Sequence, residues 1–210
     1  MFSKLQTGGL VLDSLSAGDL EWMHSLMRDP RGWTHFPAGR HTQVGNTRDF
    51  LDRVVGGWER DGLSYWAARL TSGQQIGMGG VRKLEDHWNL GFRVAFEHWN
   101  KGFATEIAVA AIAAAQAKDP TMPIVAWVDR GNAPSHAVVR RTGLVDHGEQ
   151  WEGVNCSTSM LTVPVHGPLG PSPGTTWRPL SPADTPRGPF HQQSKECWGF
   201  SNPPAVSLRT

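Results

Sequence analysis

A loop followed by a helix, residues 94–106 (VAFEHWNKGFATE), carries the clearest chemistry in the sequence. Gly102 lets the backbone approach a ligand closely, and Asn100 is one of the few residue types besides glycine that tolerate a positive φ. The helix expected from Thr105 begins with unpaired N–H groups and the positive end of its dipole. Such a turn can bind a pyrophosphate, although many glycine-containing loops before helices are plain connections.

The same loop resembles the acetyl-CoA motif of the GNAT acetyltransferases, whose usual pattern is Arg/Gln-x-x-Gly-x-Gly/Ala. Here the pattern reads Trp99-x-x-Gly102-x-Ala104. It is most similar to the branch that contains the ribosomal-protein N-terminal acetyltransferases, which often has Trp at the first position. Residues 65–69 and 76–81 lie where that branch has its central hairpin.

A second motif lies further along the chain. Asn132-x-x-Ser135, followed by Gly143-Leu144, resembles the family's Asn-x-x-Ser ahead of a Gly-Phe pair. By this resemblance Asn132 would bind the amide region of the cofactor and Ser135 would lie near its sulfur. A serine at a helix start is otherwise commonly just a cap. The resemblance covers about residues 10–163.

What the resemblance implies is an acetyl-CoA cleft between two parallel strands, one ending at Val94 and the other spanning 124–128. The pantetheine arm would lie in the gap and hydrogen-bond the exposed backbone like an added strand. Backbone N–H groups of residues 100–105 would hold the pyrophosphate, with Lys101 adding charge unless it is only a solvated surface lysine. The predicted cofactor-binding residues are Val94, Trp99, Asn100, Lys101, Gly102, Phe103, Ala104, Thr105, Asn132 and Ser135, and no metal is expected.

The implied reaction is direct attack of a neutral amine on the acetyl thioester, which requires that the ammonium first lose its proton. Many family members have a carboxylate just before the Leu-Gly-Tyr/Phe step, where this sequence has Asn89, which cannot act as a base. Tyr65, the only tyrosine, lies on an earlier strand and is expected in the core or the cleft wall. The predicted catalytic positions are Ser135, Asn89 and His87, and the alternative bases are Glu85, Asp86, Glu97, His98 or an ordered water.

Aromatic residues between the first two expected helices indicate an acceptor pocket. The family commonly builds its acceptor wall there, and this sequence has Trp33, His35 and Phe36 in that place. Such side chains suit a peptide or a small amine, but with 10 tryptophans in the chain several must simply pack the core. The expected acceptor is therefore a small-molecule amine or a peptide N-terminus.

Around these segments the hydrophobic pattern predicts a mixed α+β domain. Strands are expected at 10–15, 64–70, 76–82, 89–94, 124–128 and 160–163, and helices at 16–27, 46–61, 105–118 and 134–142. The closely spaced strands in the middle indicate antiparallel hairpins. The expected fold is GNAT-like: a mostly antiparallel sheet with helices on both faces and a V-shaped splay between two central parallel strands.

Composition separates a folded body from a tail. Residues 164–210 hold 10 of the 15 prolines, together with repeated Gly, Ser and Thr. Proline at this density removes backbone donors and blocks both helices and sheet ladders. The sequence therefore predicts a GNAT-like acetyltransferase domain over residues 1–163 and a Pro-rich, irregular or disordered tail over 164–210.

Charge and cysteine content exclude several classes of protein. The net charge of +1 gives no broad electrostatic reason to bind nucleic acid or an acidic membrane surface. The longest nearly apolar stretch, residues 107–115, is far shorter than the roughly 20 residues needed to cross a bilayer. Cys156 and Cys197 form neither a disulfide framework nor a zinc motif. A cytoplasmic protein is expected, and dimers are usual in the branch it resembles.

Three functions remain at this point. The first is an N-acetyltransferase that uses acetyl-CoA. The second is a catalytically idle acyl-CoA-binding or regulatory module, which Asn89 and the missing acid would explain. The third is a scaffold whose Pro-rich tail recruits a partner.

Overall fold

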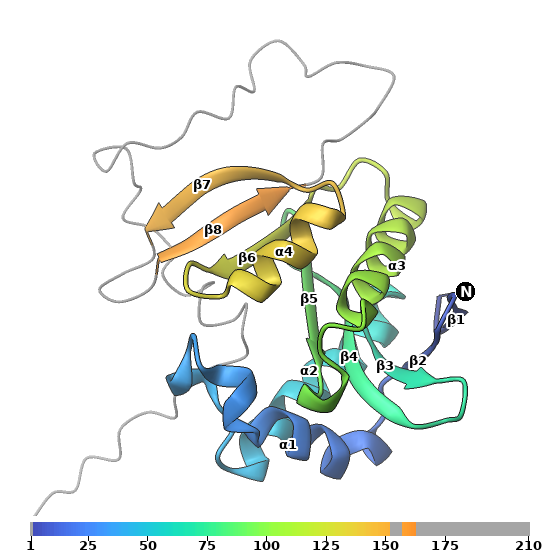
Figure 1. Ribbon diagram of the computed structural model, residues 1–210. Helices are drawn as coiled ribbons and strands as arrows, with labels where there is room; N and C mark the ends of the chain where they lie inside the picture. Colours follow the sequence, from blue (N-terminus) through green and yellow to red (C-terminus); the bar gives the residue numbers. More distant parts are fainter. Residues whose placement is uncertain (1, 152–156, 163–210) are drawn as a thin grey trace, which may run out of the picture.

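One eight-stranded sheet runs through the protein in the order β1–β2–β3–β4–β5–β6–β8–β7 (Figure 1). The computed structural model describes residues 2–151 and 157–162. The strands are β1 (Lys4–Gln6), β2 (Leu10–Ser14), β3 (Tyr65–Leu70), β4 (Gln75–Lys83), β5 (Trp88–Val94), β6 (Ile124–Asp129), β7 (Val145–Trp151) and β8 (Ser157–Thr162). Every neighbouring pair is antiparallel except β5 and β6, which are parallel. This confirms the predicted mixed, mostly antiparallel fold.

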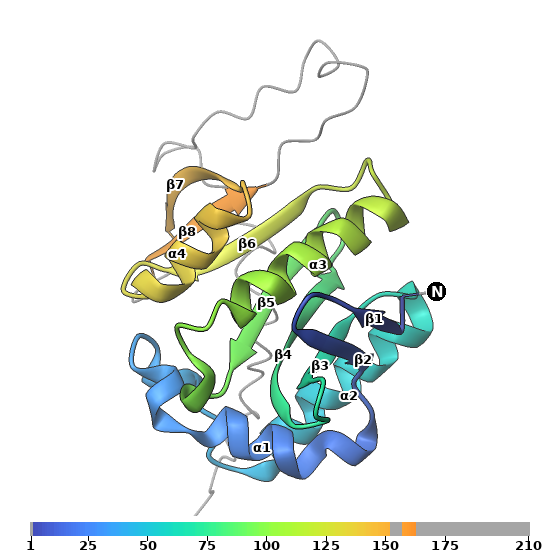
Figure 2. The same ribbon diagram turned by 45° about the vertical axis from the view of Figure 1, so that its right-hand side comes forward.

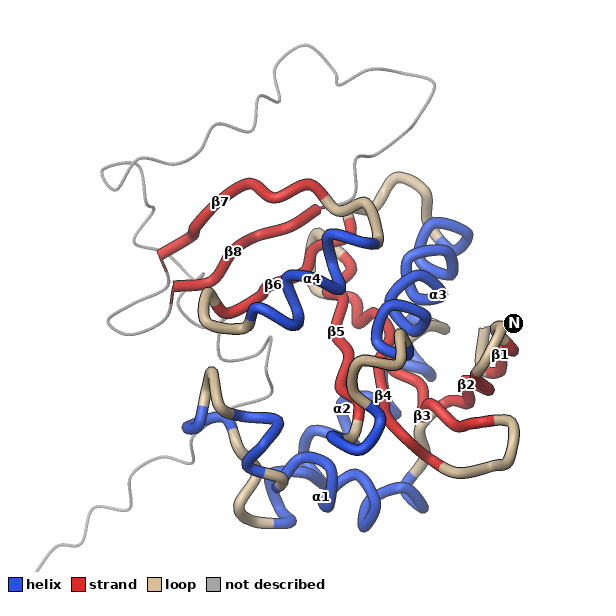
Figure 3. Tube along the Cα trace, viewed as in Figure 1, coloured by secondary structure: helices blue, strands red, loops and turns tan. Residues whose placement is uncertain are grey.

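Helices cover both faces of the sheet (Figures 2 and 3). The α-helices are α1 (Leu20–Arg28), α2 (Val44–Asp61), α3 (Phe103–Lys118) and α4 (Ala133–Arg141). Short 3-10 turns are η1 (Ala17–Asp19), η2 (Pro30–Trp33), η3 (Pro37–Gly39) and η4 (Phe96–His98). The buried residues of α3 and α4 belong to one hydrophobic cluster, and those of α1 and α2 belong to a second cluster on the opposite face.

The alternation of side chains along the strands separates these two clusters. In β3, Trp66 and Ala68 pack under α3, whereas Tyr65 and Ala67 pack against α1 and α2. In β5, Trp88, Leu90 and Val94 belong to the α3 cluster and Phe92 packs against it, so Asn89, Gly91 and Arg93 face the α1 and α2 side. Each central strand therefore presents different chemistry to its two faces.

Small residues let α3 lie close to the sheet. Ala108, Ala111 and Ala115 of the helix are fully buried, and the strands beneath carry glycines. A Cβ added at Gly79 would stand 2.7 Å from Cγ2 of Ile107 and 2.8 Å from the backbone oxygen of Gly91. Only a residue without a side chain fits there, which sets how closely the start of α3 approaches β4 and β5.

The central parallel pair separates after two residue pairs. β5 pairs with β6 only at Trp88↔Ile124 and Asn89↔Val125. Beyond that point β5 keeps its pairing with β4 up to Val94, while β6 pairs with β8. The side of β5 that faces β6 is therefore without a strand partner from Leu90 onward, which confirms the predicted splay.

Two strands were not predicted from the sequence, and the ends of several helices and strands differ from the predicted ones. β1 and β7 are the two edges of the sheet, and Lys4, Gln6 and residues 145–148 are exposed, so these sequences lack the apolar alternation of buried strands. The predicted helices at 105–118, 46–61 and 134–142 begin one or two residues earlier, at Phe103, Val44 and Ala133. The expected last strand is β8, although Val163 lies outside the described residues, as does the predicted tail, 164–210. Among the described residues no helix is long and apolar enough to cross a bilayer.

Replacing Gly79 by Ala tests the close approach of α3 to the sheet. The added Cβ meets backbone atoms that cannot rotate away, so we expect the free energy of unfolding to fall by about 1–3 kcal/mol in urea denaturation. The matched control is Gly56→Ala within α2, where nothing lies within 4 Å and the change should stabilise by about 0.5–1 kcal/mol. Equal stability of both variants would contradict the packing described here.

Candidate functional site

The loop between β5 and α3 ends in two left-handed residues. Asn100 has a φ of 60° and is the only residue other than glycine with a positive φ in the described part of the chain. Gly102 has a φ of 84° and is the N-cap of α3, so no side chain caps the helix start. The N–H groups of the first turn, Phe103 to Thr105, therefore have no capping partner and point toward the loop. This turn provides the donors that the sequence predicted.

Trp99 holds this loop against the end of β5. Its indole Nε1 donates to the backbone oxygen of Val94 at 2.8 Å, and its ring lies 5.0 Å from that of Phe96, centroid to centroid. Trp99, Phe103 and Ala104 also pack against the main hydrophobic cluster. The side chains of these motif residues therefore pack inward and shape the loop. Lys101 is exposed.

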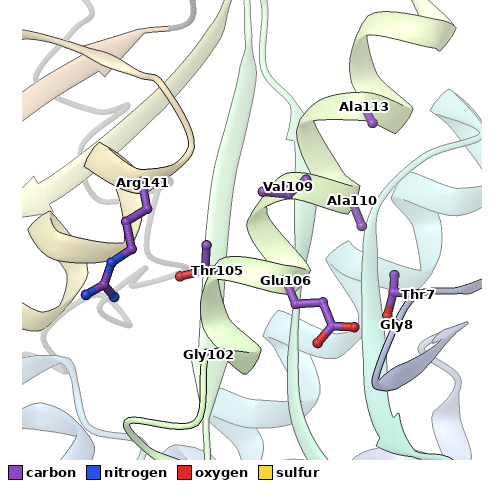
Figure 4. Close-up of a pocket in the computed structure, with 9 residues that line it drawn as sticks. All are labelled: Thr7, Gly8, Gly102, Thr105, Glu106, Val109, Ala110, Ala113 and Arg141. Carbon is purple, nitrogen blue, oxygen red and sulfur yellow. The ribbon is translucent and has the colours of Figure 1, made fainter.

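A groove lies along the outer face of α3 from its first turn onward (Figure 4). It is lined by Thr7, Gly8, Gly102, Thr105, Glu106, Val109, Ala110, Ala113 and Arg141. Thr105 and Arg141 stand on one side of the helix start, whereas Glu106 points to the β1–β2 turn on the other side. Because Oε1 of Glu106 accepts a 2.6 Å hydrogen bond from the Gly9 N–H, its carboxylate is directed away from the uncapped turn. The groove thus has a cationic and hydroxyl-bearing flank beside the free donors.

Asn132 connects the second motif to the loop before α2. Its Oδ1 accepts from the N–H of Ser135 at 3.2 Å and caps α4, so Ser135 is the third helical residue and is not the cap. Its Nδ2 lies 3.1 Å from Nε2 of His35. Because Oδ1 is already the acceptor for Ser135, the amide nitrogen must donate to His35, and Nε2 of His35 carries no proton. The proton of the neutral ring is then on Nδ1.

The surroundings of His35 favour this neutral form. Burial lowers the pKa of His35 below its ordinary value, the positive charge of Arg93 lowers it further, and Asp129 opposes the shift. The ring is therefore uncharged near neutral pH. It joins the predicted acceptor wall to the turn after β6, at the open end of the splay.

The other two predicted acceptor residues lie at different depths. Trp33 is only 2% exposed, its Nε1 donates to the oxygen of Met27 at 2.6 Å, and its ring stacks on that of His41. Phe36 is half-buried beside it. Trp33 thus supports the wall from inside, and His35 is the predicted member that reaches the second motif.

The predicted catalytic positions do not lie together. His87 precedes the two residues at which β5 and β6 are joined, and its Nδ1 lies 2.7 Å from Oδ1 of Asp86. Asn89 is buried at that joined end, with 4% exposed. Ser135 lies at the other end of the splay, where β5 and β6 are apart. It follows β6, which continues for four residues beyond its last pair with β5. Of the alternative bases, Glu97 is bound to Arg31 at 2.8 Å. In the described residues no cluster of His, Cys, Asp or Glu is suited to hold a metal.

Arg93 is the site residue that the sequence reasoning missed. It is the fourth residue after Asn89 in β5 and faces the α1 and α2 side. Burial lowers its pKa to about 10, so it keeps its charge at neutral pH. A charged residue inside the otherwise uncharged strand NLGFRV was the signal that could have found it.

Comparison with a family model decides the classification. Residues 10–145 match the acetyltransferase (GNAT) domain. The chain belongs to the GNAT family of acetyltransferases. The match covers both motifs, from the strand before α1 to the start of β7.

Solved structures of acetyltransferases share this fold. An acetyltransferase from Agrobacterium tumefaciens is 22% identical with a TM-score of 0.66, over 76% of this chain and 93% of that one. A GNAT-family acetyltransferase from Bacillus anthracis is 18% identical with a TM-score of 0.65, over 76% and 97%. RimL, a ribosomal L7/L12 alpha-N-protein acetyltransferase in complex with coenzyme A, is 14% identical with a TM-score of 0.64, over 75% and 94%. A comparison with curated proteins finds no match.

Changes at Asn132 separate its two hydrogen bonds. Asn132→Asp keeps the oxygen that caps α4 but replaces the donor to His35 by a carboxylate, so stability should stay within about 0.5 kcal/mol of the parent. The new negative charge should raise the pKa of His35, which NMR titration of its ring protons measures. Asn132→Ala removes the cap as well and should cost about 0.5–2 kcal/mol in urea unfolding. If the pKa of His35 in Asn132→Asp equals that in the parent, the contact between His35 and Asn132 is contradicted.

Proposed function

We propose that this GNAT domain transfers the acetyl group of acetyl-CoA to a primary amine, either a protein N-terminus or a small amine, within a ternary complex. The observation that carries the proposal is the splay of the sheet. β5 lacks a strand partner on one side from Leu90 to Val94, directly before a loop that ends in an uncapped helix start. A linear ligand with a diphosphate at one end fits this combination.

The chain's residues suit each part of acetyl-CoA. The free backbone groups of β5 can hydrogen-bond the pantetheine arm as a neighbouring strand would. The N–H groups of residues 103–105 can hold the diphosphate, with the positive end of the α3 dipole behind them. Asn132 and Ser135 would bind the pantetheine end, and Thr105 and Arg141 border the groove beside the diphosphate. When bound, acetyl-CoA supplies the activated acetyl thioester.

The acceptor would approach from the face opposite α3, where Trp33, His35 and Phe36 form a wall. Its neutral nitrogen attacks the acetyl carbon, a C–N bond forms as the C–S bond breaks, and CoA leaves as a thiolate that can take up the proton lost by the attacking nitrogen. Asn89 cannot accept that proton, and His87 lies at the joined end of the splay. The residues present thus favour an amine that loses its proton on entering a desolvated pocket or to ordered water.

A second candidate function is an acyl-CoA-binding module without turnover. The observation that favours it is Asn89, a buried amide at the step where the family resemblance leads one to expect a carboxylate. This candidate shares the cofactor site with the first. The two differ only in whether an amine is acetylated.

The experiment that separates them measures binding and turnover on the same preparation of full-length protein. Calorimetry with CoA tests the site, and thiol release from acetyl-CoA is followed with amines that include a peptide with a free N-terminus, an amino acid and a polyamine. We expect CoA binding and thiol release with at least one amine. Binding without release from any amine would favour the idle module, and absence of CoA binding would overturn both.

Gly102→Ala tests the uncapped turn directly. A side chain at a φ of 84° strains the backbone, so the loop and the first N–H groups of α3 must shift. We expect the dissociation constant for CoA to rise by about tenfold or more, measured by calorimetry. Gly73→Ala is the matched control, because Gly73 has a φ of 89° and open space around it, and it belongs to the β3–β4 turn rather than to this loop. If both variants bind CoA like the parent, the diphosphate does not lie on this turn.

A further inference from the structure

Arg93 occupies a special place on the strand that borders the splay. It lies between Phe92 and Val94, in the part of β5 that has no partner on the β6 side. Val94 packs under α3, so Arg93 projects to the opposite face. This is the face from which an acceptor reaches the open side of β5.

The guanidinium of Arg93 is held in a fixed position. Its Nη1 donates to the backbone oxygen of Gly32 at 2.8 Å, and its central carbon lies 3.7 Å from the centre of the Trp33 ring. A Cβ at Gly32 would stand 2.6 Å from Nη1, so the absence of a side chain there leaves room for the guanidinium. Trp33 is itself fixed by its bond to Met27. The positive charge is thus placed by a rigid wall.

The charge of Arg93 is not neutralised within the described part of the chain. None of the ion pairs among the described residues includes it. Asp29 is near enough to influence Arg93 electrostatically, but both of its carboxylate oxygens already accept from Nε of Arg31 at 2.9 Å. A guanidinium has five N–H donors, and one of them is used for a backbone oxygen. Planar donors of this kind match a carboxylate in geometry and charge.

His35 adds a second donor to the same wall. Its Nε2 accepts from Asn132, which places the ring proton on Nδ1. Arg93 is close enough to His35 for its charge to act on the ring. A neutral imidazole can donate to an anion without requiring a second positive charge in the pocket.

We propose that Arg93, assisted by His35, binds a carboxylate carried by the acceptor, so that the preferred acceptor is a primary amine with a carboxylate a few bonds away. This inference rests on the proposed acetyl transfer and names its substrate class: a free amino acid or a peptide whose N-terminal residue is acidic. Polyamines and other purely cationic amines would meet the guanidinium and be disfavoured by like charge.

Matched acceptor pairs test the proposal with full-length protein and acetyl-CoA. One pair is phenylalanine and phenylalaninamide, which tests a free amino acid. The other is Asp-Ala-Phe-amide and Asn-Ala-Phe-amide, which tests an acidic peptide terminus. We expect kcat/KM to be about 10- to 100-fold higher for the carboxylate member of at least one pair. The pair that shows the difference tells whether the carboxylate belongs to a free amino acid or to the acidic N-terminal residue of a peptide.

Variants assign the preference to Arg93. Arg93→Met should abolish it, Arg93→Lys should keep part of it, and Gly32→Ala should weaken it by displacing the guanidinium while leaving its charge. Arg28→Met is the control, an exposed arginine at the end of α1 whose removal should change nothing. Calorimetry with CoA and circular dichroism establish that each variant is folded and binds the cofactor. Equal rates within both pairs, or a preference that survives Arg93→Met, would overturn the proposal.

A readout without turnover separates this inference from the proposed function. Binding of N-acetylphenylalanine and its amide, and of N-acetyl-Asp-Ala-Phe-amide and N-acetyl-Asn-Ala-Phe-amide, to the CoA-saturated protein is measured by calorimetry. Tighter binding of the carboxylate member of either pair that is lost in Arg93→Met supports the anion site even if no amine is acetylated. Equal binding within both pairs counts against it, whatever the outcome of the transfer assay.

Discussion

The site depends on one constraint, the end of parallel pairing between β5 and β6 after two residue pairs. Backbone N–H and C=O groups require partners, and a strand edge in the middle of a sheet normally has them. From Leu90 to Val94 that edge of β5 faces a gap, and β6 turns to β8 for its own pairing. The fold thereby presents a short open strand edge in its centre, which an extended ligand can complete.

Two features keep that edge in place. On the α3 side, glycines in β4 and β5 and alanines in α3 let the helix lie directly over the strands, so the uncapped first turn is held close to the end of β5. Trp99 fixes the intervening loop by its bond to Val94. On the other face, η2 reaches β5 through Gly32 and Arg93, and His35 reaches the turn after β6. The gap is thus bounded by packed segments on both faces.

The sequence predicted those parts of the fold whose signals are local. The Ala-rich helix, the central hairpins and the turn at Gly102 follow from periodicity and from residue types with special φ preferences, and the structure has them close to the expected places. The edge strands β1 and β7 lack such signals because each has a neighbouring strand on one side only, and Lys4, Gln6 and residues 145–148 are exposed. The splay itself came from the family resemblance, since no local pattern states which strand pairs end early.

Contacts between segments distant in the chain could not be predicted from the sequence. His35 and Asn132 are 97 positions apart, and their hydrogen bond forms because the fold brings the loop before α2 beside the start of α4. Arg93 and Gly32 are 61 positions apart, and a lone arginine in an apolar strand does not reveal what its guanidinium touches. His87 was predicted because histidine is a common general base, but the register of β5 and β6 places it at the joined end.

The alternation of side chains along β5 gives this single strand two separate tasks. Leu90 and Val94 anchor it under α3, and Asn89 and Arg93 face the layer of α1 and α2. In the proposed function the backbone edge binds acetyl-CoA, so the side chains that face α1 and α2 can vary without disturbing that binding. A strand of this kind can therefore keep acetyl-CoA as the acetyl donor while the side chains that face α1 and α2 set which acceptor is used. In this protein the side chain on that face at the open end, Arg93, carries a positive charge. The charge is costly to bury, as its lowered pKa of about 10 reflects, and the face of the Trp33 ring and the oxygen of Gly32 offset part of that cost.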